Sequence, residues 1–416
     1  MALGYAALDA NTTASANTAI GDQALTDNTT GTNLVAVGQG SLENNTTAND
    51  NTAVGRYALR ANTTGADNIA IGYNALVANT TASQNIAMGS YAGDAVTTGG
   101  ANTIIGYNAG SQVDIGSGNT FVGQDAGTAT VNSNGKWNTA VGLNALKSNH
   151  AFFQSTAVGQ NCLQASTAHG ATGYGSNACA SSTSGENNNG FGYFTLNEAT
   201  TAQQNAAFGT VALRRATTGS YNTGMGVGAI QYVTTGSNNT ALGYNAGSSL
   251  TTGSSCILIG KEANVSGASN SELVIGTSAT GIGNNTGLIY PPGGGNMYQA
   301  TNATTWAQTS DERIKKNIVD NNEGISKLKD IQVRNFEYRT EDEVTELPSH
   351  LAVKQAGIQL GVIAQEIEKV LPEVVMTESS GQKTVNTDNL TWYLVNAVKE
   401  LSTQVEELKS KLNEGE

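Results

Sequence analysis

The amino-acid sequence predicts a mainly β protein, in which a β-solenoid or β-roll rod is followed by a small α+β domain that ends in a coiled-coil helix. Two observations predict the rod: a glycine recurs every 17 residues, and the residues between these glycines carry strand and turn signals. A third observation, a change of composition near residue 300, marks a domain boundary. We therefore expect residues 1–280 to form the rod, 281–304 a transition and 305–416 the second domain.

The marker glycines define a series of stacked units. Their spacing is unbroken from Gly4 to Gly123, lengthens to 19 residues before Gly142, shortens to 16 before Gly175, and then returns to 17 as far as Gly260. A fixed short period is typical of units that each contact mainly their two neighbours. Seventeen units at the spacing of neighbouring strands would make a rod of roughly 80 Å.

Each unit reads approximately Asn-Thr-Ala-Val-Gly-Tyr-Asn-Ala-Leu, followed by turn residues such as Asn-Thr-Thr-Gly. This composition favours two short extended stretches per unit, separated by turns. An asparagine precedes most marker glycines by four residues, and equivalent asparagines would stack about 4.8 Å apart and bond amide to amide. A row of ligand or ion sites is the alternative hypothesis. These asparagines are Asn17, Asn51, Asn68, Asn85, Asn102, Asn119, Asn138, Asn188, Asn205, Asn222 and Asn239.

The Asn-Thr-Ala-Val-Gly units resemble the left-handed β-roll heads of trimeric bacterial adhesins, and resemble even more closely the repeats of phage tail fibers. This resemblance implies a homotrimer. Only 6% of the chain is aromatic, and Ala, Thr, Asn and Gly dominate the repeats, so one thin coil has little room for a large core. We expect the rod to gain stability by wrapping with copies of itself.

Composition excludes several other classes of protein. The formal net charge is −13 and no basic stripe is present, so nucleic-acid binding is not expected. Residues 1–300 carry 13 of the 33 carboxylates, whereas residues 301–416 carry the other 20. No secretory leader or membrane-spanning pattern is evident, so membrane insertion is not expected. The histidines are isolated, and Cys162, Cys179 and Cys256 replace small repeat residues, so we expect no metal, cofactor or disulfide.

Three blocks of the C-terminal region carry a second resemblance. Residues 305–318 contain Thr-Ser-Asp-Glu-Arg-Ile-Lys-Lys-Asn, residues 361–373 read Gly-Val-Ile-Ala-Gln-Glu-Ile-Glu-Lys-Val-Leu-Pro-Glu, and residues 385–394 lead into the last helix. In this order they resemble the intramolecular chaperone auto-processing domain found at the C-termini of phage tail spikes, endosialidases and tail fibers. In that family a Ser–Lys dyad lies in the first block, which implies Ser310 and Lys315 as the catalytic pair.

The implied reaction is a single cut of the chain beside Ser310, at the Ser310–Asp311 bond. A serine hydroxyl needs a base, and a lysine can serve when burial or cationic neighbours lower its pKa. The enzymatic activity would then be at most that of a Ser–Lys endopeptidase acting once on its own chain. The alternative is that Ser310 and Asp311 only cap a helix, and that the domain stays attached as in some relatives.

A heptad seam is predicted on the last helix, which we place at about residues 388–413. Its apolar positions alternate spacings of four and three. We favour a self-association helix that holds three chains together, with packing against the chain's own core as the alternative. Because identical repeats specify register poorly, such a clamp would set the starting unit. The seam residues are Leu394, Val398, Leu401, Val405, Leu408 and Leu412.

The leading hypothesis is therefore a homotrimeric virion tail fiber for host attachment, assembled in the host cytoplasm. Its expected partners are its own copies, a host cell-surface receptor or glycan, and a virion baseplate or tail protein at the N-terminus. Trp137, Phe152 and Phe153, in or beside the irregular segment 143–192, are the predicted receptor contacts, since aromatic faces bind sugars. The alternative is that these rings fill a kink in the stack.

Other functions remain as alternatives. A glycan-degrading tail spike needs two carboxylates at a set separation in a groove, and the rod's acidic residues are scattered; Asp114 and Asp125 would be the first to test. A bacterial trimeric surface adhesin would need a secretion signal and a membrane barrel, and neither pattern is present. A membrane-bound transcription factor with the same processing domain would need a DNA-binding region.

Overall fold

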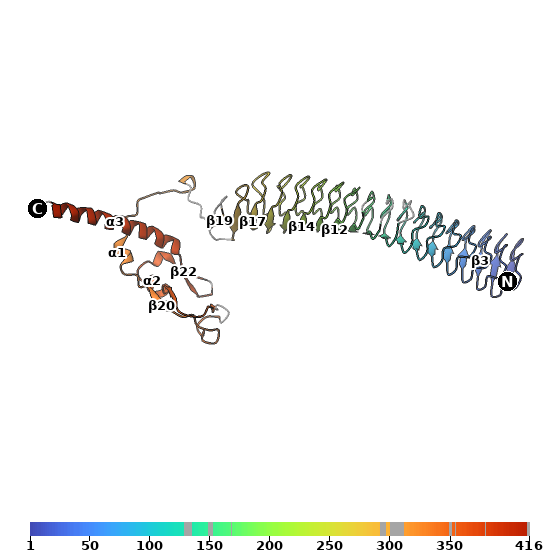
Figure 1. Cartoon of the computed structure of the whole chain (residues 1–416), viewed down its shortest axis with the longest axis horizontal. Helices are drawn as coiled ribbons and strands as arrows, with labels where there is room; N and C mark the ends of the chain where they lie inside the picture. Colours follow the sequence, from blue (N-terminus) through green and yellow to red (C-terminus); the bar gives the residue numbers. More distant parts are fainter. Residues whose placement is uncertain are drawn as a thin grey trace. The chain divides into compact units, whose positions relative to one another are not determined.

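The computed structural model describes the chain except for residues 129–134, 149–152, 168, 292–296, 300–311, 349–351, 354, 379 and 414–416. The chain divides into two compact units, residues 1–309 and residues 310–416. The first unit is a β-solenoid with a spacing of about 17 residues per turn, and the second contains small sheets and a long C-terminal helix (Figure 1). The predicted fold class is therefore confirmed.

One short strand forms in each turn of the solenoid, and strands β1 to β18 pair in chain order, each parallel to the next. The register survives both irregular steps, since Thr120 pairs with Thr139 and Thr156 with Thr172. A final strand, β19 (Met297–Gln299), pairs antiparallel with β18. The stacked strands are β1 (Ala2–Leu3), β2 (Thr18–Ile20), β3 (Val35–Val37), β4 (Thr52–Val54), β5 (Ile69–Ile71), β6 (Ile86–Met88), β7 (Thr103–Ile105), β8 (Thr120–Val122), β9 (Thr139–Val141), β10 (Thr156–Val158), β11 (Thr172–Tyr174), β12 (Asn189–Phe191), β13 (Ala206–Phe208), β14 (Thr223–Met225), β15 (Thr240–Leu242), β16 (Ile257–Ile259), β17 (Leu273–Gly276) and β18 (Gly287–Tyr290).

The expectation of two extended stretches per turn was wrong, because the segment after each marker glycine forms turns. In the turn that begins at Gly72, Asn74 and Leu76 have φ values of 54° and 51°, in the left-handed region that a strand cannot use. The marker glycine itself has a steric cause. Gly72 has a φ of 138°, and a Cβ on it would lie 2.4 Å from the carbonyl oxygen of Gly89 in the next turn.

The core of the solenoid is thin and keeps a constant cross-section. In seven turns an inward alanine in the middle of the strand is combined with a buried leucine four residues after the marker glycine. Phe121 replaces the alanine in β8, and Gly110 and Gly127 then occupy the leucine positions beside it. A Cβ on Gly127 would lie 2.6 Å from Cδ1 of Phe121. Leu258 and Gly247 show the same exchange, with a Cβ on the glycine 2.8 Å from Leu258 Cδ1.

The predicted asparagine ladder lies inside the rod. Asn68 donates from its backbone N–H and from Nδ2 to Oδ1 of Asn51, at 2.9 and 3.1 Å, and from Nδ2 to the carbonyl oxygen of Ala82 at 2.9 Å. The same amide-to-amide bond recurs further along, for example from Asn239 to Asn222 at 3.0 Å. These side chains are buried and satisfied by one another, so the bonds support the structural hypothesis over a row of ligand sites.

A second ladder of buried asparagines was not predicted. It consists of Asn28, Asn45, Asn62 and Asn79. The Nδ2 of each of the last three donates to Oδ1 of the asparagine one turn earlier, at 2.9 to 3.0 Å. The ladder ends because Val96 takes the next equivalent position, and Oδ1 of Asn79 is left buried without a partner. The Asn-x-Thr triplets that contain Asn28, Asn62 and Asn79 are therefore interior structure and not accessible modification sites.

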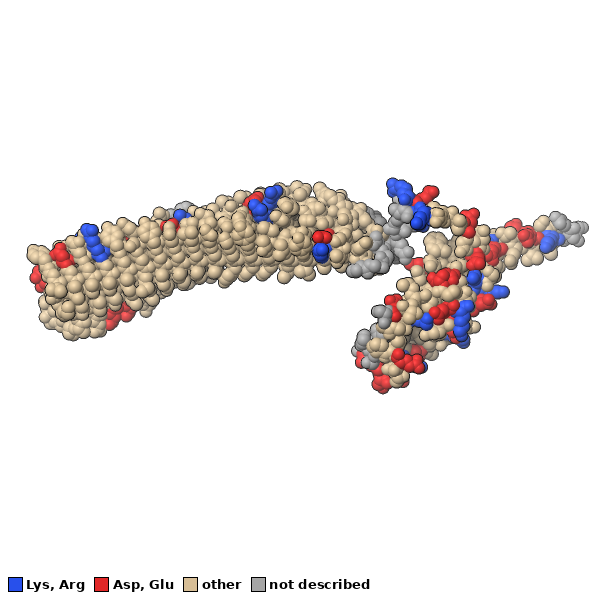
Figure 2. Space-filling view, turned by 180° about the vertical axis from the view of Figure 1, so that it is seen from behind, with Lys and Arg blue, Asp and Glu red and all other residues tan. Residues whose placement is uncertain are grey.

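The second unit is small and carries most of the charged side chains, whereas the visible face of the rod shows few (Figure 2). It has two antiparallel sheets of two strands each, and a core formed by Ile367, Leu371 and Val374. The parallel stack of the first unit continues to Tyr290, past residue 280. The elements of the second unit are η1 (Glu312–Ile314), α1 (Ile325–Leu328), β20 (Arg334–Phe336), β21 (Gln359–Gly361), α2 (Ala364–Ile367), η3 (Pro372–Val374), β22 (Val375–Thr377), β23 (Lys383–Val385) and α3 (Thr387–Asn413).

Candidate functional site

An apolar row lies on the outer face of the solenoid strands. In the three-residue strands only the middle side chain is buried, so the first and third positions face outward. The third position, directly before each marker glycine, is apolar in every turn, and several of its side chains are 38% to 47% exposed: Met88, Tyr174, Phe208, Met225 and Leu242. Exposed apolar surface of this kind is typical of interaction sites. We call this feature the outer apolar row.

Three aromatic rings stack within the outer apolar row. Tyr174 and Phe191 have ring centroids 5.2 Å apart with planes 9° from parallel, and Phe191 and Phe208 are 4.7 Å apart at 2°. They come from β11, β12 and β13, which pair in register, so strand spacing places the rings face to face. The stack therefore presents a continuous apolar surface over three turns.

Of the three predicted receptor contacts, the structure brings two together. The ring centroids of Trp137 and Phe153 lie 6.3 Å apart, while Phe152 falls outside the described residues. Trp137 is 61% exposed, and its ring packs over Gly118, where a Cβ would lie 2.9 Å from Cδ1 of the indole. His169, which has no neighbour at ligand spacing in the sequence, stacks on Phe153 with ring centroids 6.0 Å apart and planes 17° from parallel. The spacing of 17 residues does not predict that Trp137, Phe153 and His169 meet, because they lie in the turns where this spacing is irregular.

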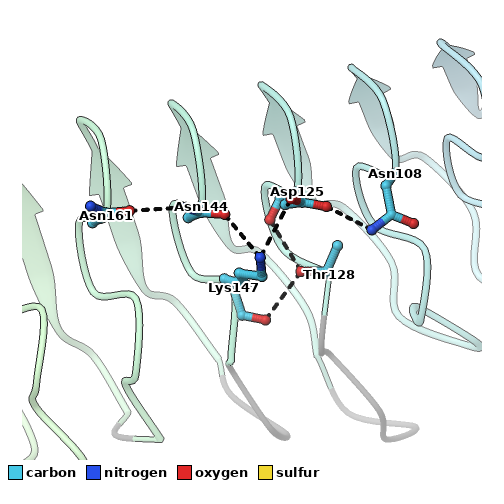
Figure 3. Close-up of polar contacts among 6 residues, drawn as sticks. All are labelled: Asn108, Asp125, Thr128, Asn144, Lys147 and Asn161. Carbon is cyan, nitrogen blue, oxygen red and sulfur yellow. Dashed lines mark hydrogen bonds and ion pairs between the residues drawn. The ribbon is translucent and has the colours of Figure 1, made fainter.

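Polar side chains bridge successive turns at Asp125 (Figure 3). Asn108 Nδ2 donates to Asp125 Oδ1 at 2.7 Å, and Lys147 Nζ lies 3.4 Å from Asp125 Oδ2 and 3.1 Å from Asn144 Oδ1. Asn144 Nδ2 in turn donates to Asn161 Oδ1 at 3.0 Å. Burial would raise the pKa of Asp125, but the hydrogen bond from Asn108 and the Lys147 ammonium outweigh it and hold the pKa below its ordinary value.

The carboxylates considered for glycan cleavage do not form a catalytic pair. Asp125 lies two residues after its marker glycine and both of its oxygens are engaged, so it is held as a structural anion. Asp114 lies eight residues after its marker glycine and accepts a hydrogen bond from Thr97 Oγ1. Within the described ranges, no group of three or more His, Cys, Asp or Glu side chains is arranged to hold a metal ion. The three cysteines are buried and unpaired.

The geometry of the predicted Ser–Lys dyad lies largely outside the described residues. Ser310 and Asp311 are not described, whereas Lys315 follows η1 as an exposed residue whose backbone N–H donates to the carbonyl oxygen of Glu312 at 3.0 Å. The catalytic pair and the cleavage position therefore stay predictions.

The heptad seam of α3 is exposed to solvent. Its six side chains are between 46% exposed (Val405) and 77% exposed (Leu412), and Ala397 is the buried residue of the helix. The seam is therefore not packed into the chain's own core, which was the alternative hypothesis for this stripe. The side chains are Leu394, Val398, Leu401, Val405, Leu408 and Leu412. No helix in the described part of the chain is long and apolar enough to cross a membrane.

A different side of α3 docks on the rest of its domain. The backbone of Gly324 approaches closely, since a Cβ there would lie 2.4 Å from the backbone nitrogen of Ala397. The N–H of Ile325 donates to Glu400 Oε2 at 3.0 Å, and Asn396 Nδ2 donates to the carbonyl oxygen of Asn321 at 2.8 Å. These contacts fix the rotation of the helix about its axis, so that the seam faces outward.

Charged hydrogen bonds tie the elements of this domain together. The Tyr393 hydroxyl on α3 donates to Glu373 Oε1 on η3 at 2.6 Å; this bond raises the pKa of Tyr393 to about 12 and lowers that of Glu373. Arg334 on β20 binds both carboxylate oxygens of Glu366 on α2, at 2.9 and 3.1 Å, and this bond lowers the pKa of Glu366. The domain is therefore held by polar contacts around a very small core.

Comparison with known families identifies the C-terminal segment. Residues 310–376 match the family model described as chaperone of endosialidase. The match begins at the first residue of the second compact unit. Searches of curated proteins and of solved structures gave no match. The chain thus combines a long β-solenoid with a C-terminal segment of the endosialidase-chaperone type, as the sequence predicted, and this combination is consistent with a tail fiber or endosialidase-type protein.

Proposed function

We propose that this protein is a homotrimeric virion tail fiber for host attachment, in which the solenoid is the shaft and the C-terminal domain is the chaperone that sets the register of the three chains. The outer apolar row carries this proposal. A single coil leaves the row partly exposed to water, whereas a second copy in the same direction offers an apolar residue at the same position of every turn. Burial of that row favours association by about 25 cal/mol per Å².

The exposed seam of α3 supports the chaperone role. Near-identical turns dock one step out of register at little local cost, so assembly needs a feature that occurs once per chain. The seam is such a feature, and the docked side of α3 presents it outward. Val398 and Val405 at a positions with Leu394, Leu401 and Leu408 at d positions favour two strands in an isolated coiled coil. We therefore propose that contacts between the solenoid faces determine the trimeric state, and that the helix determines the register of the chains.

The native mass of the full-length protein in solution tests this assembly. We expect three times the chain mass of 42.6 kDa for Ser310→Ala, in which the cut proposed below cannot shorten the chain, and this variant is the background for the substitutions that follow. Leu401→Asp places a charge in the seam and should reduce the trimer fraction, while Glu406→Gln, at an exposed position off the seam, should leave it unchanged. A Ser310→Ala mass of one or two chains would contradict the proposed trimer.

We also propose that the chaperone domain cuts its own chain at Ser310–Asp311 after assembly. The support is the family match that begins at Ser310 and the lysine five residues later. Removal of the clamp would make unfolding hard to reverse and would trap the rod kinetically.

The denatured mass of the wild type beside Ser310→Ala tests the cut. Wild type should separate into fragments of residues 1–310 and 311–416, whereas Ser310→Ala and Lys315→Met should stay whole. If the wild type also stays whole while it forms trimers, the cleavage proposal fails and the chaperone domain is a permanent part of the fiber.

A further inference from the structure

A second exposed aromatic surface lies on the shaft, on turns that precede Trp137. Tyr73 and Tyr91 meet edge to face with centroids 5.2 Å apart, and Tyr91 and Tyr107 do so at 6.2 Å. Tyr73 is 37% exposed and Tyr107 is 56% exposed. Together with Arg56 and Tyr57 on the turn before, these rings follow four successive marker glycines; we call the five residues the arginine–tyrosine surface.

Arg56 is held in place at one end of this surface. Its guanidinium carbon lies 4.6 Å from the ring centre of Tyr57 and 5.9 Å from that of Tyr73, and Nη2 donates to the Tyr57 hydroxyl at 3.1 Å. Tyr57 is itself fixed over Gly40, where a Cβ would lie 2.7 Å from its ring. The guanidinium is therefore oriented in advance by two rings and a hydroxyl.

Its charge is not neutralised by the protein. Neighbouring Arg60, 4.9 Å from the ring centre of Tyr57, forms an ion pair with Glu43 at 2.7 Å. Arg56 has no carboxylate partner among the described residues, and its contacts are the two tyrosines. An oriented guanidinium with open N–H donors is the group that recognises a planar carboxylate through two parallel hydrogen bonds.

Two acceptor oxygens in the same turns lack donors. Asn74 lies between Tyr57 and Tyr91 in the row of second positions after the marker glycines, and its Oδ1 is buried without a hydrogen-bond partner. Oδ1 of Asp94, three residues after Tyr91, is also buried without a hydrogen-bond partner. Buried acceptors without donors are rare in folded proteins, but both of these oxygens are covered by protein. A ligand on the surface would therefore bind through Arg56 and the exposed rings and not through these oxygens.

We propose that the arginine–tyrosine surface binds an acidic saccharide, with a sugar carboxylate on Arg56 and sugar rings on Tyr73 and Tyr107. This inference rests on the proposed role of the shaft in host attachment. Three steps between turns, about 14 Å in all, separate Arg56 from Tyr107, so the surface suits an oligosaccharide. The apolar face of a sugar ring packs on an aromatic ring, and phenol hydroxyls form hydrogen bonds with the sugar hydroxyls. A nucleic acid fits less well, because it brings a phosphate at every nucleotide and the surface offers one unpaired cation.

Immobilised oligosaccharides test the proposal, with hexuronic and sialic acids each paired with its carboxyl-reduced counterpart. Full-length wild type should prefer at least one acidic member over its counterpart by about tenfold, the value of one charge-assisted contact. Arg56→Gln should abolish the preference, and Tyr73→Ala should weaken binding to both members of the pair. Arg214→Gln is the matched control, since Arg214 lies over Phe194 at 5.4 Å and beside Glu198 on other turns.

Equal retention of every acidic and neutral pair, or a preference that survives Arg56→Gln, would overturn the proposal. Binding of a single-stranded thymidine oligomer that is lost in Arg56→Gln would assign the surface to nucleic acid instead. The native mass of the same samples separates the two levels of inference. A trimer without saccharide preference contradicts only this site, whereas a monomer contradicts the proposed assembly.

Discussion

At the scale of residues, the shaft compensates a large side chain in a strand by a glycine at the leucine position of the same or the preceding turn. Where the strand has an inward alanine, a leucine often lies four residues after the marker glycine; where the strand has Phe121, that position is Gly127. The left-handed backbone at the leucine position is the same in both cases, with a φ of 51° at Leu59 and 63° at Gly127. A leucine is therefore compatible with the backbone of Gly127, and only Phe121 excludes it.

This exchange predicts a compensating pair of substitutions. Phe121→Ala should lower stability by about 3–5 kcal/mol, because the flanking glycines have no side chain to fill the cavity. Gly127→Leu alone should also destabilise, through overlap with the Phe121 ring. The double variant should regain much of the loss, since it recreates the alanine–leucine core of other turns. Thermal unfolding followed by circular dichroism measures all three; a double variant as unstable as the sum of the single variants would contradict the exchange.

At the scale of elements, one side of α3 contacts its own domain and another side is exposed to solvent. One side is bound to its own domain through Tyr393, Asn396 and Glu400, and another carries the exposed seam. The heptad spacing predicted the seam, because the apolar pattern is visible in the sequence. The docking side could not be predicted, since it depends on a glycine backbone and on single polar contacts, two of which come from segments more than seventy residues away.

The bond between Tyr393 and Glu373 predicts a pH-dependent stability of this docking. The pKa of Glu373 is lowered, so its stabilisation is present above the ordinary carboxyl pKa and is lost as the pH falls through the folded value. The pKa of Tyr393 is raised from 10.0 to about 12, so its stabilisation is complete below pH 10 and is lost as the pH rises through about 12.

Tyr393→Phe tests this dependence. The variant should melt at a lower temperature than wild type between pH 6 and 9, and the difference should shrink in strong acid and in strong base. The helix signal in circular dichroism reports the docking, and Tyr338→Phe serves as the control for loss of a phenol elsewhere in the domain. A difference between Tyr393→Phe and wild type that stays constant with pH would contradict the assignment.

At the scale of the whole molecule, the period of 17 residues was the feature most visible in the sequence. The marker glycine must accept a close approach of the next turn, and no other residue does so at a φ near 138°. The outward placement of the apolar row was not predicted, because alternation in a three-residue strand does not say which side is the core. The second asparagine ladder was hidden among triplets that are typical of surface turns.

Removal of a whole turn should therefore be tolerated. Deletion of residues 39–55, which joins Gly38 to Arg56, keeps every later strand in register and should leave a trimer with a similar melting temperature. Deletion of residues 39–46 alone is the control, since it places strand residues opposite turn residues and should cause aggregation or a lower melting temperature. Native mass and circular dichroism distinguish the two outcomes, and equal damage from both deletions would contradict independent turns.

The buried asparagine ladders also give the shaft an electrical direction. In every bond between successive ladder asparagines described above, the amide of the later turn donates to the oxygen of the earlier one. Side-chain amide dipoles in such a column add head to tail, as peptide dipoles do along a helix. Each column has its positive end toward the N-terminus of the shaft and its negative end toward the C-terminus. In the ladder from Asn28 to Asn79, the negative end is the unpaired oxygen of Asn79.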